Sequence, residues 1–180
     1  MRRHLIQLAF VSTLGLLSAC GGGGATPAAS PPATPQQSTS AQVSSLEASG
    51  SLPNLDRTSS LTGTDANADG VRDDIAQWIQ QRPATPEQKN ALTALARANQ
   101  SALTVDVAND LSLRAVAAQQ HAAVKCVVRR GANQLAGTKT VPTLRDYTAN
   151  TAQRAQAYRN YAAALDGAVL KSPEGDGCVN

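Results

Sequence analysis

The sequence predicts an all-α domain, a small, alanine-rich bundle of about four helices. Two observations lead to this fold class. After residue 73, apolar side chains recur three and four residues apart, the spacing that places them on one face of a helix. Nowhere does an alternation of apolar and polar residues run long enough for a strand. Aromatic residues make up only 3% of the chain, so the core should be thin, because alanine buries little apolar area.

The first 52 residues are expected to lie outside this domain. Residues 1–19 are typical of an export signal, because a positively charged start precedes an apolar run, Leu5 to Leu17, that is too short to span a membrane. Residues 20–52 are rich in Gly, Ala, Pro and Ser and bury too little apolar surface to offset the entropy of ordering them. We therefore expect a disordered linker there and a folded domain over residues 53–180.

The end of the signal, Leu17-Ser18-Ala19-Cys20, is similar to the lipobox of bacterial lipoproteins. The resemblance implies cleavage before Cys20, a diacylglycerol on its sulfur and anchoring in a lipid bilayer, for which two acyl chains suffice. A glycine rather than an aspartate follows the cysteine, which implies sorting to the outer membrane. The alternative is an ordinary signal that is cleaved near Ala19.

Net charge does not favour nucleic acid as a partner. The chain has 16 basic and 13 acidic residues, and removal of the signal would take Arg2 and Arg3 and leave an excess of one positive charge. Four of the acids lie between Asp65 and Asp74. Without a broad basic surface there is little to attract a phosphate backbone, so we expect no nucleic-acid partner.

The turn before the first helix carries an acidic motif, D-A-N-A-D-G-V-R-D-D, over residues 65–74. Oxygen-bearing side chains occupy alternate positions, and Gly70 follows where the chain must turn sharply. Calcium takes about six to eight oxygen ligands, and this alternation lets a curled backbone aim successive side chains at one centre. The expected calcium ligands in the loop, residues 65–76, are Asp65, Asn67, Asp69, the Val71 carbonyl, Asp73 and Asp74.

The spacing is similar to that of the EF-hand loop except at its twelfth position, where Ala76 replaces a bidentate glutamate. With no helix expected before it, the loop resembles the calcium loops of dockerin and thrombospondin type 3 modules, and a class of uncharacterised bacterial exported proteins in which such a loop opens a helical domain. The resemblance implies a structural calcium ion bound at about 10⁻⁴ to 10⁻³ M, with Asp74 or a distant carboxylate such as Asp56 as the replacement ligand. The alternative is a plain turn whose Asp73 and Asp74 favour the following helix through its dipole.

Two helices are expected directly after the loop. The first spans about residues 73–81 and ends at Arg82, because the residue before a proline avoids the helical region. The second begins at Thr85, a cap that is followed by a proline at the first helical position. Gln88 is placed to complete a capping box, and the helix should continue to about Leu103.

Two more helices are expected in the second half of the domain. The third follows a break that is capped by Asp106 or Asn109. Residues 131–142 contain two glycines and a proline and are expected to form a loop, and the fourth helix should start at Thr143. The predicted inward faces are Leu111, Ala115, Ala118, Ala122 and Cys126 on the third helix, and Tyr147, Thr151, Arg154, Tyr158, Ala162 and Leu165 on the fourth.

Two cysteines remain once Cys20 is lipidated. An exported protein meets an oxidising compartment, in which two thiols of one small domain most simply pair. We expect a disulfide between Cys126 and Cys178, and closing this loop of about 50 residues would remove roughly 4 kcal/mol of unfolded-state entropy. The alternative is a catalytic thiol or a metal ligand at either position.

Two functional hypotheses follow. We favour a non-enzymatic lipoprotein of the outer membrane, a binding or structural module of the cell envelope that is stabilised by calcium and a disulfide. Its partners would be the lipid bilayer, through acylated Cys20, and an envelope protein or cell-wall polymer. The alternative is a calcium-stabilised hydrolase acting on envelope polymers, with the carboxylates of residues 65–74 near the chemistry. His121, the sole histidine after the signal, lies among alanines and glutamines and gives a serine or cysteine nucleophile little support.

Overall fold

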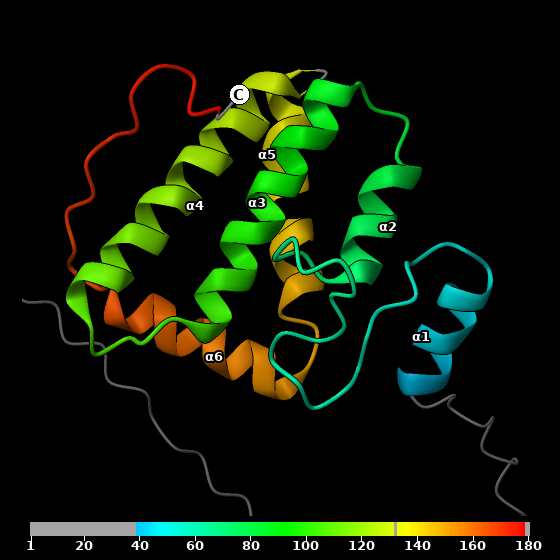
Figure 1. Ribbon diagram of the computed structural model, residues 1–180. Helices are drawn as coiled ribbons and strands as arrows, with labels where there is room; N and C mark the ends of the chain where they lie inside the picture. Colours follow the sequence, from blue (N-terminus) through cyan, green and yellow to red (C-terminus); the bar gives the residue numbers. More distant parts are fainter. Residues whose placement is uncertain (1–38, 132, 179–180) are drawn as a thin grey trace, which may run out of the picture. The chain divides into compact units, whose positions relative to one another are not determined.

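Helices account for all the regular structure in the described part of the chain, residues 39–131 and 133–178 of a computed structural model (Figure 1). The absence of strands from these residues confirms the all-α class. The described residues belong to one compact unit, Gln37–Asn180. The helices are α1 (Thr39–Ala48), α2 (Asp73–Gln81), α3 (Pro86–Thr104), α4 (Asp110–Arg130), α5 (Gln134–Thr148) and α6 (Ala152–Ala164).

The expected export signal, residues 1–19, lies outside the described residues. The same holds for Cys20, the expected site of lipidation, and for the first half of the expected linker. Among the residues that are described, none of the helices combines the length and the apolar character that crossing a bilayer requires.

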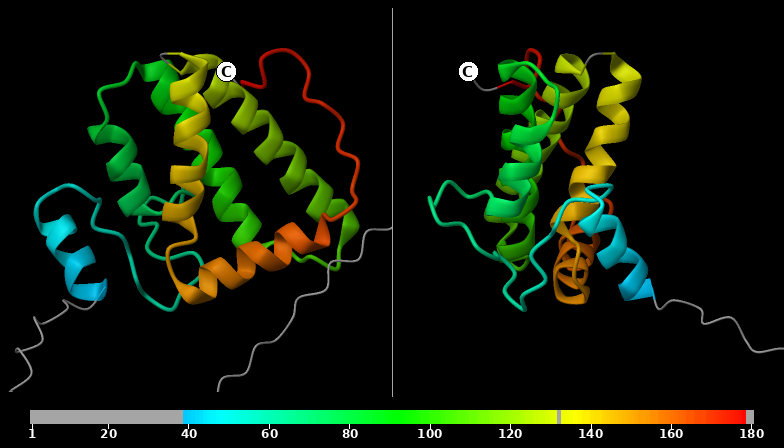
Figure 2. Two further views of the ribbon diagram at one scale, coloured as in Figure 1. Left: turned by 180° about the vertical axis from the view of Figure 1, so that it is seen from behind. Right: turned by 90° about the vertical axis from the view of Figure 1, so that its right-hand side faces the viewer.

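α3 is the helix around which the others are arranged. It contacts α2, α4, α5 and α6, and α4 also packs along α5. In Figures 1 and 2 the axes of α3, α4 and α5 run roughly alongside one another, while α6 lies across one end of them. The opposite end, which we call the upper end, collects the end of α2, the start of α3, the end of α4 and the start of α5.

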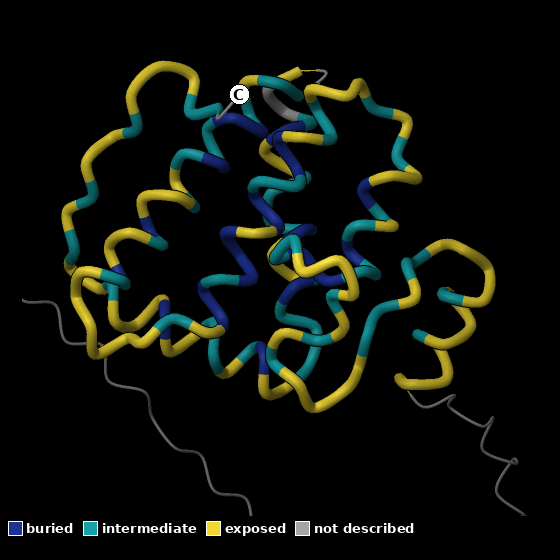
Figure 3. The backbone as a smooth tube through the Cα atoms, viewed as in Figure 1, coloured by how far each residue is buried: buried dark blue, intermediate teal, exposed yellow. Residues whose placement is uncertain are grey.

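The core is divided into two clusters. The larger one joins α2, α3, α4 and α5 and includes Ile79, Leu95 and Leu144, each 0% exposed. The smaller one joins α3, α4 and α6 around Leu113 and Tyr161. Figure 3 shows the buried backbone concentrated along α3. A buried leucine or isoleucine contributes about 1.5–3 kcal/mol through removal of apolar area from water, so these few large side chains matter more than the many alanines.

The first helices of the bundle begin and end close to where the sequence predicts them. α2 spans residues 73–81, and Arg82 is its C-cap. At the start of α3, the Thr85 hydroxyl accepts the Gln88 N–H at 3.3 Å, and the Gln88 side-chain oxygen accepts the Thr85 N–H at 3.0 Å, which completes the capping box. Asn109, one of the two expected caps, caps α4.

The predicted loop over residues 131–142 is wrong, because α5 runs through most of it and contains Pro142. Gly137 allows a close approach of two helices, since a Cβ there would lie 2.8 Å from the Val127 carbonyl oxygen of α4. Leu144, two residues after the proline, is fully buried in the larger core cluster. That packing offsets the hydrogen bond which proline removes from the helix.

The predicted fourth helix is interrupted and forms two helices. α5 ends at Thr148, the next three residues are not helical, and α6 begins at Ala152. Thr151, assigned to the inward face of one long helix, is instead the N-cap of α6 and accepts the Arg154 N–H at 3.2 Å. The interruption turns the chain across the end of the bundle.

Residues 39–48, which belong to the expected linker, form the helix α1. No residue of this helix is buried. Glu47 accepts two hydrogen bonds from the Arg57 guanidinium, the shorter at 2.6 Å. The low apolar content of this segment agrees with its lack of buried residues. It does not predict the ion pair between Glu47 and Arg57.

The predicted inward face of the third helix is also largely wrong. Leu111, at the start of α4, is 82% exposed, and Ala115 and Ala118 are exposed as well. The error follows from the sequence itself, because alanine occurs all around this helix and leaves the apolar stripe poorly defined. The buried residues of α4 are Leu113, Ala117, Ala123, Cys126 and Val127.

A disulfide joins Cys126 of α4 to Cys178, as predicted. The chain after α6 runs back along the outer side of α4 to reach it (Figure 1). Lys125 donates to a backbone carbonyl of this segment at 2.8 Å, and Arg130 pairs with Asp176 at 3.1 Å. The C-terminal segment, residues 165–178, is therefore held on α4 by one covalent bond and a few polar contacts.

Candidate functional site

The acidic loop curls around the side chain of its first member. The Asp65 carboxylate accepts the Asp69 N–H at 3.2 Å and the Gly70 N–H at 2.9 Å. Two left-handed residues produce the curl, Ala68 with φ of 54° and Gly70 with φ of 81°. Glycine adopts this conformation freely, whereas alanine does so only with strain. The loop therefore carries backbone strain at Ala68 while its N–H groups converge on Asp65.

The other side chains of the loop are joined to one another and to its backbone. The Asn67 amide donates to the Asp69 carboxylate at 3.1 Å, and the other oxygen of Asp69 accepts the Val71 N–H at 2.8 Å. Asp73, in the first turn of α2, reaches back to the Ala66 N–H, 3.2 and 3.3 Å from its two oxygens. Val71 is itself buried in the larger core cluster. Four of the predicted side-chain ligands thus belong to one loop that is fixed to the bundle.

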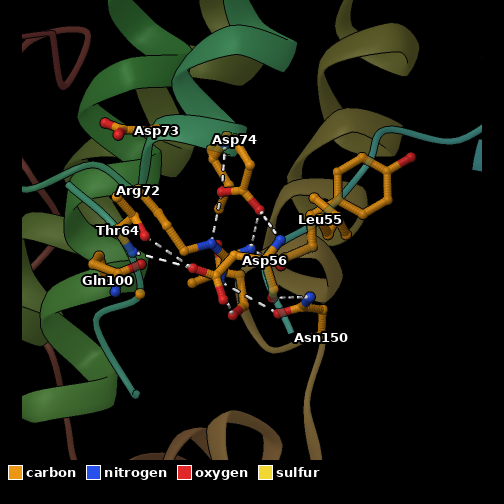
Figure 4. Close-up of polar contacts among 12 residues, drawn as sticks. Leu55, Asp56, Thr64, Arg72, Asp73, Asp74, Gln100 and Asn150 are labelled. Atoms are coloured by element: carbon orange, nitrogen blue, oxygen red, sulfur yellow. Dashed lines mark hydrogen bonds and ion pairs between the residues drawn. The ribbon is translucent and has the colours of Figure 1, made fainter. Parts of the chain in front are cut away.

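Asp74, the remaining predicted side-chain ligand, takes part in a different set of contacts (Figure 4). Its two oxygens pair with Arg72, at 2.6 Å to Nε and 2.9 Å to Nη2, and one of them accepts the Asp56 N–H at 2.7 Å. Asp56, the other proposed replacement ligand, accepts the Thr58 N–H at 2.7 Å and the Thr64 N–H at 3.1 Å. Both carboxylates therefore already have charged or polar partners away from Asp73, which points in another direction in the same view.

Two buried arginines organise these contacts, and both side chains are 0% exposed. Arg154 donates to the Asp56 carbonyl at 2.6 Å, to the Asp56 carboxylate at 3.2 Å and to the Asn150 side chain at 2.9 Å. Arg72 donates to the last two carbonyls of α5, at 3.0 and 3.3 Å. They tie the segment before the loop to the junction of α5 and α6. We call the group Asp56, Arg72, Asp74, Asn150 and Arg154 the arginine network.

The sequence prediction missed the arginine network, although one signal for it was present. Arg154 fell on the predicted inward face of a helix, among tyrosines and alanines. A guanidinium in such a position is tolerated only when carboxylates or carbonyls meet it there. Apart from Asn150, the residues that meet it are 93 to 98 positions earlier in the chain, a separation that no local pattern reports.

Asp56 is the carboxylate most strongly affected by this environment. Burial of the carboxyl group raises its pKa, but hydrogen bonds from Thr58, Arg154 and Thr64 act in the opposite direction and outweigh burial. The pKa of Asp56 is therefore held well below its ordinary value. The folded protein favours the ionised form of this side chain over the protonated one.

The acidic loop lacks the positive partners that the arginine network has. In the described residues, the carboxylates of Asp65, Asp69 and Asp73 form no ion pair with lysine or arginine. Arg97 of α3 does reach the loop, but its Nε donates to the Asp69 carbonyl at 2.6 Å rather than to a carboxylate. Three negative charges are thus gathered in a short loop without a neutralising side chain.

The donor set of the loop suits a hard cation. Three carboxylates, one amide oxygen and one backbone carbonyl are the ligand types that calcium prefers. An ionised carboxylate has about four lone-pair sites, so an oxygen that accepts a loop N–H can also meet an ion. Within the described residues, however, no three His, Cys, Asp or Glu side chains lie together as a metal-holding group. The amide, the carbonyl or water would have to complete the shell.

Two hollows open on the described part of the molecule. The larger, about 410 Å³, lies between α3 and α4 beside the disulfide, and Glu87, Arg97 and Arg130 are its charged lining residues. The smaller, about 140 Å³, lies at the upper end and includes Arg82 and Arg130 in its lining. Glu87 is the one carboxylate among these described lining residues. The hydrolase alternative needs paired carboxylates in a cleft, and it remains a hypothesis from the sequence.

Comparison with known proteins identifies no relative of this chain. No protein-family model matches the chain, and no curated protein or solved structure matches it significantly.

Proposed function

We propose that the protein is an exported, lipid-anchored module of the bacterial outer membrane, without enzymatic activity, whose helical domain is stabilised by a calcium ion in the acidic loop. The export and anchoring parts rest on the sequence of residues 1–20. The calcium part rests on one observation above the others: Asp65, Asp69 and Asp73 lie within nine residues of one curled loop, and none of them has a lysine or arginine partner among the described residues. A divalent cation would supply the missing positive charge.

The oxygen donors of the loop indicate which residues would bind calcium. Asp65, Asn67, Asp69 and Asp73 would contribute side-chain oxygens, and Val71 its carbonyl. Asp74 would act indirectly, since its bonds to Arg72 and to the Asp56 N–H hold the first turn of α2 against the preceding segment. Calcium would therefore stabilise the attachment of this segment to the bundle.

Thermal unfolding of the protein with calcium and with a chelator tests the proposal. We expect calcium to add about 1–3 kcal/mol to the free energy of unfolding when it is well above its dissociation constant, and a calorimetric titration to report one site. Asp65→Asn should remove most of this gain. Asp166→Asn, which changes an exposed aspartate outside the loop, should leave it intact. An unchanged melting temperature and no heat of binding would rule out the calcium site.

The anchor has its own test. The mass of the mature protein from a bacterial host should correspond to cleavage before Cys20 with acyl chains attached, and Cys20→Ser should move the protein out of the outer-membrane fraction. A mature amino terminus at any other residue would contradict the anchor without affecting the calcium site. The binding partner of the module would then be sought by affinity capture from envelope extracts.

A further inference from the structure

The upper end of the bundle carries a cluster of cations that the proposed function does not use. We call this cluster the basic pole. It is formed where α2 ends, α3 starts, α4 ends and α5 starts (Figures 1 and 2). These helix ends meet around the smaller cavity, and the Gln88 side chain of α3 donates to the Arg130 carbonyl of α4 at 2.8 Å. Its members are Arg82, Lys89, Arg129, Arg130 and Lys139.

Acids balance this charge only in part. Glu87 and Asp176 are two acidic groups that interact with Arg130 of the pole. Hydrogen bonds lower the pKa of both carboxyl groups, and the charge of Arg130 lowers it further. Arg130 pairs with Asp176 at 3.1 Å. Five cations therefore face two carboxylates, although the chain as a whole has an excess of only three basic residues. Much of the positive charge of the protein is collected at one end of the domain.

Internal contacts account for some of these cations but not for all. Lys89 donates to the Gln80 carbonyl at 2.7 Å, and the Arg82 guanidinium lies over the Trp78 ring at 4.5 Å from its centroid. Arg129 and Lys139 are exposed, and their charged side-chain groups have no hydrogen-bond or ion-pair partner among the described residues. The negative end of the α4 dipole can stabilise Arg129, but Lys139 lies in the amino-terminal half of α5, towards its positive end.

We propose that the basic pole docks the helical domain on an anionic phospholipid surface. The cations come from four helix ends that meet at one end of the bundle, so they can reach a flat surface together, whereas a linear polymer would be better matched by a row along a groove. Each lysine or arginine near an anionic membrane strengthens association about fivefold. The inference rests on the lipid anchor of the proposed function, which would keep the pole close to a bilayer at high effective concentration.

Chemical labelling of lysines in the full chain tests the docking. The protein is reconstituted into vesicles of phosphatidylcholine or of phosphatidylglycerol, treated briefly with an amine-acetylating reagent, and analysed by mass spectrometry. Lys139 should react at least about fivefold more slowly on phosphatidylglycerol, and high salt should abolish the difference, because salt screens exposed charges. Lys171, which is 88% exposed and belongs to the C-terminal segment rather than to the four helix ends, should react equally on both vesicles.

A matched pair of variants separates the pole from the overall charge. Arg129→Gln should restore about fivefold of the Lys139 reactivity on phosphatidylglycerol. Arg159→Gln removes the same charge from an exposed residue of α6, at the opposite end of the bundle, and should leave the protection unchanged. Equal protection in both variants would overturn the assignment of the contact to the pole.

The remaining outcomes are also decisive. If Lys139 reacts equally on both vesicle types, docking on anionic lipid is wrong. If soluble polyphosphate protects Lys139 and phosphatidylglycerol vesicles do not, the pole binds an anionic polymer and the bilayer assignment is wrong. A protein that fails to float with phosphatidylcholine vesicles contradicts the anchor instead, and the same protein mixed with phosphatidylglycerol vesicles still reports on the pole.

Discussion

Two groups of carboxylates, adjacent in the chain, are stabilised in different ways. In the arginine network, Asp56 and Asp74 meet two fully buried guanidinium groups. In the acidic loop, Asp65, Asp69 and Asp73 accept hydrogen bonds from the loop itself and have no cationic side chain within the described residues. The first group is complete with protein atoms alone. In the second group the hydrogen bonds are made, but the negative charge is not balanced by a cationic side chain. A cation from solution would therefore stabilise the second group more than the first.

The largest expected effect is on the arginine network. Arg154→Met should lower the free energy of unfolding by about 3–5 kcal/mol, because it leaves a largely buried carboxylate and several carbonyls without their partner. Arg159→Met, an exposed residue of the same helix, should change it by less than about 0.5 kcal/mol. Denaturant unfolding measures both. A small effect for Arg154→Met would show that water replaces the guanidinium and that the network is not closed.

One aspartate of each group can be replaced by asparagine to test whether the two groups respond differently to calcium. Asp74→Asn should destabilise the protein by about 1.5–3 kcal/mol, the value of hydrogen bonds to a charged group, whether calcium or a chelator is present. Asp73→Asn should cost about 1–3 kcal/mol with calcium but be neutral or slightly stabilising in chelator, because it removes one of three like charges. Thermal unfolding under both conditions checks this. Equal losses for Asp73→Asn in the two conditions would mean that its role is structural.

Acid should affect the arginine network through Asp56. Its pKa is lower in the folded than in the unfolded state, so its contribution to stability is present above the unfolded value, about pH 4, and is lost as the pH falls through the folded-state pKa. The loss should be smaller than that caused by Arg154→Met, because the arginine keeps its carbonyl partners. In denaturant unfolding at several pH values, the difference between the wild type and Asp56→Asn should shrink below about pH 4. A difference that does not depend on pH would contradict the assignment.

The smallest expected effect concerns the backbone of the acidic loop. Ala68→Gly should stabilise the protein by up to about 1 kcal/mol, because alanine is strained at its φ of 54°. Ala118→Gly, at an exposed position inside α4, should destabilise it by about 0.5–1 kcal/mol. Opposite signs for the same chemical change would place the strain in the loop. Loss of stability in both variants would show that the loop is not held in this conformation in solution.

The parts of the fold that could be predicted from the sequence are those determined by near neighbours. The capping box at Thr85 and Gln88 requires only residues three positions apart, and the helix of residues 73–81 is bounded by local signals. Pro142 misled the prediction, because a helix breaker is overridden when the residues around it pack on another helix. From the sequence, Gly137 favours a loop. In the structure it lies in a helix, where the missing side chain lets α5 approach α4 closely.

The candidate site shows the same division. The composition and spacing of residues 65–73 predict a calcium-type loop, because its ligands would come from positions close together in the chain. The arginine network could not be found in this way, since Arg154 meets Asp56 across 98 positions of sequence. The prediction of Asp74 as a ligand did not take account of Arg72, two residues earlier, which pairs with that carboxylate at 2.6 Å.

The disulfide has a consequence for how the molecule responds to proteases. Cys126 and Cys178 are 52 positions apart, so α5 and α6 lie inside a covalent ring. Cleavage after Lys171, which is 88% exposed, would open that ring without releasing a fragment. The two parts of a nicked molecule would stay together until a reductant is added, and protein analysed only under reducing conditions would look degraded when it is still in one piece.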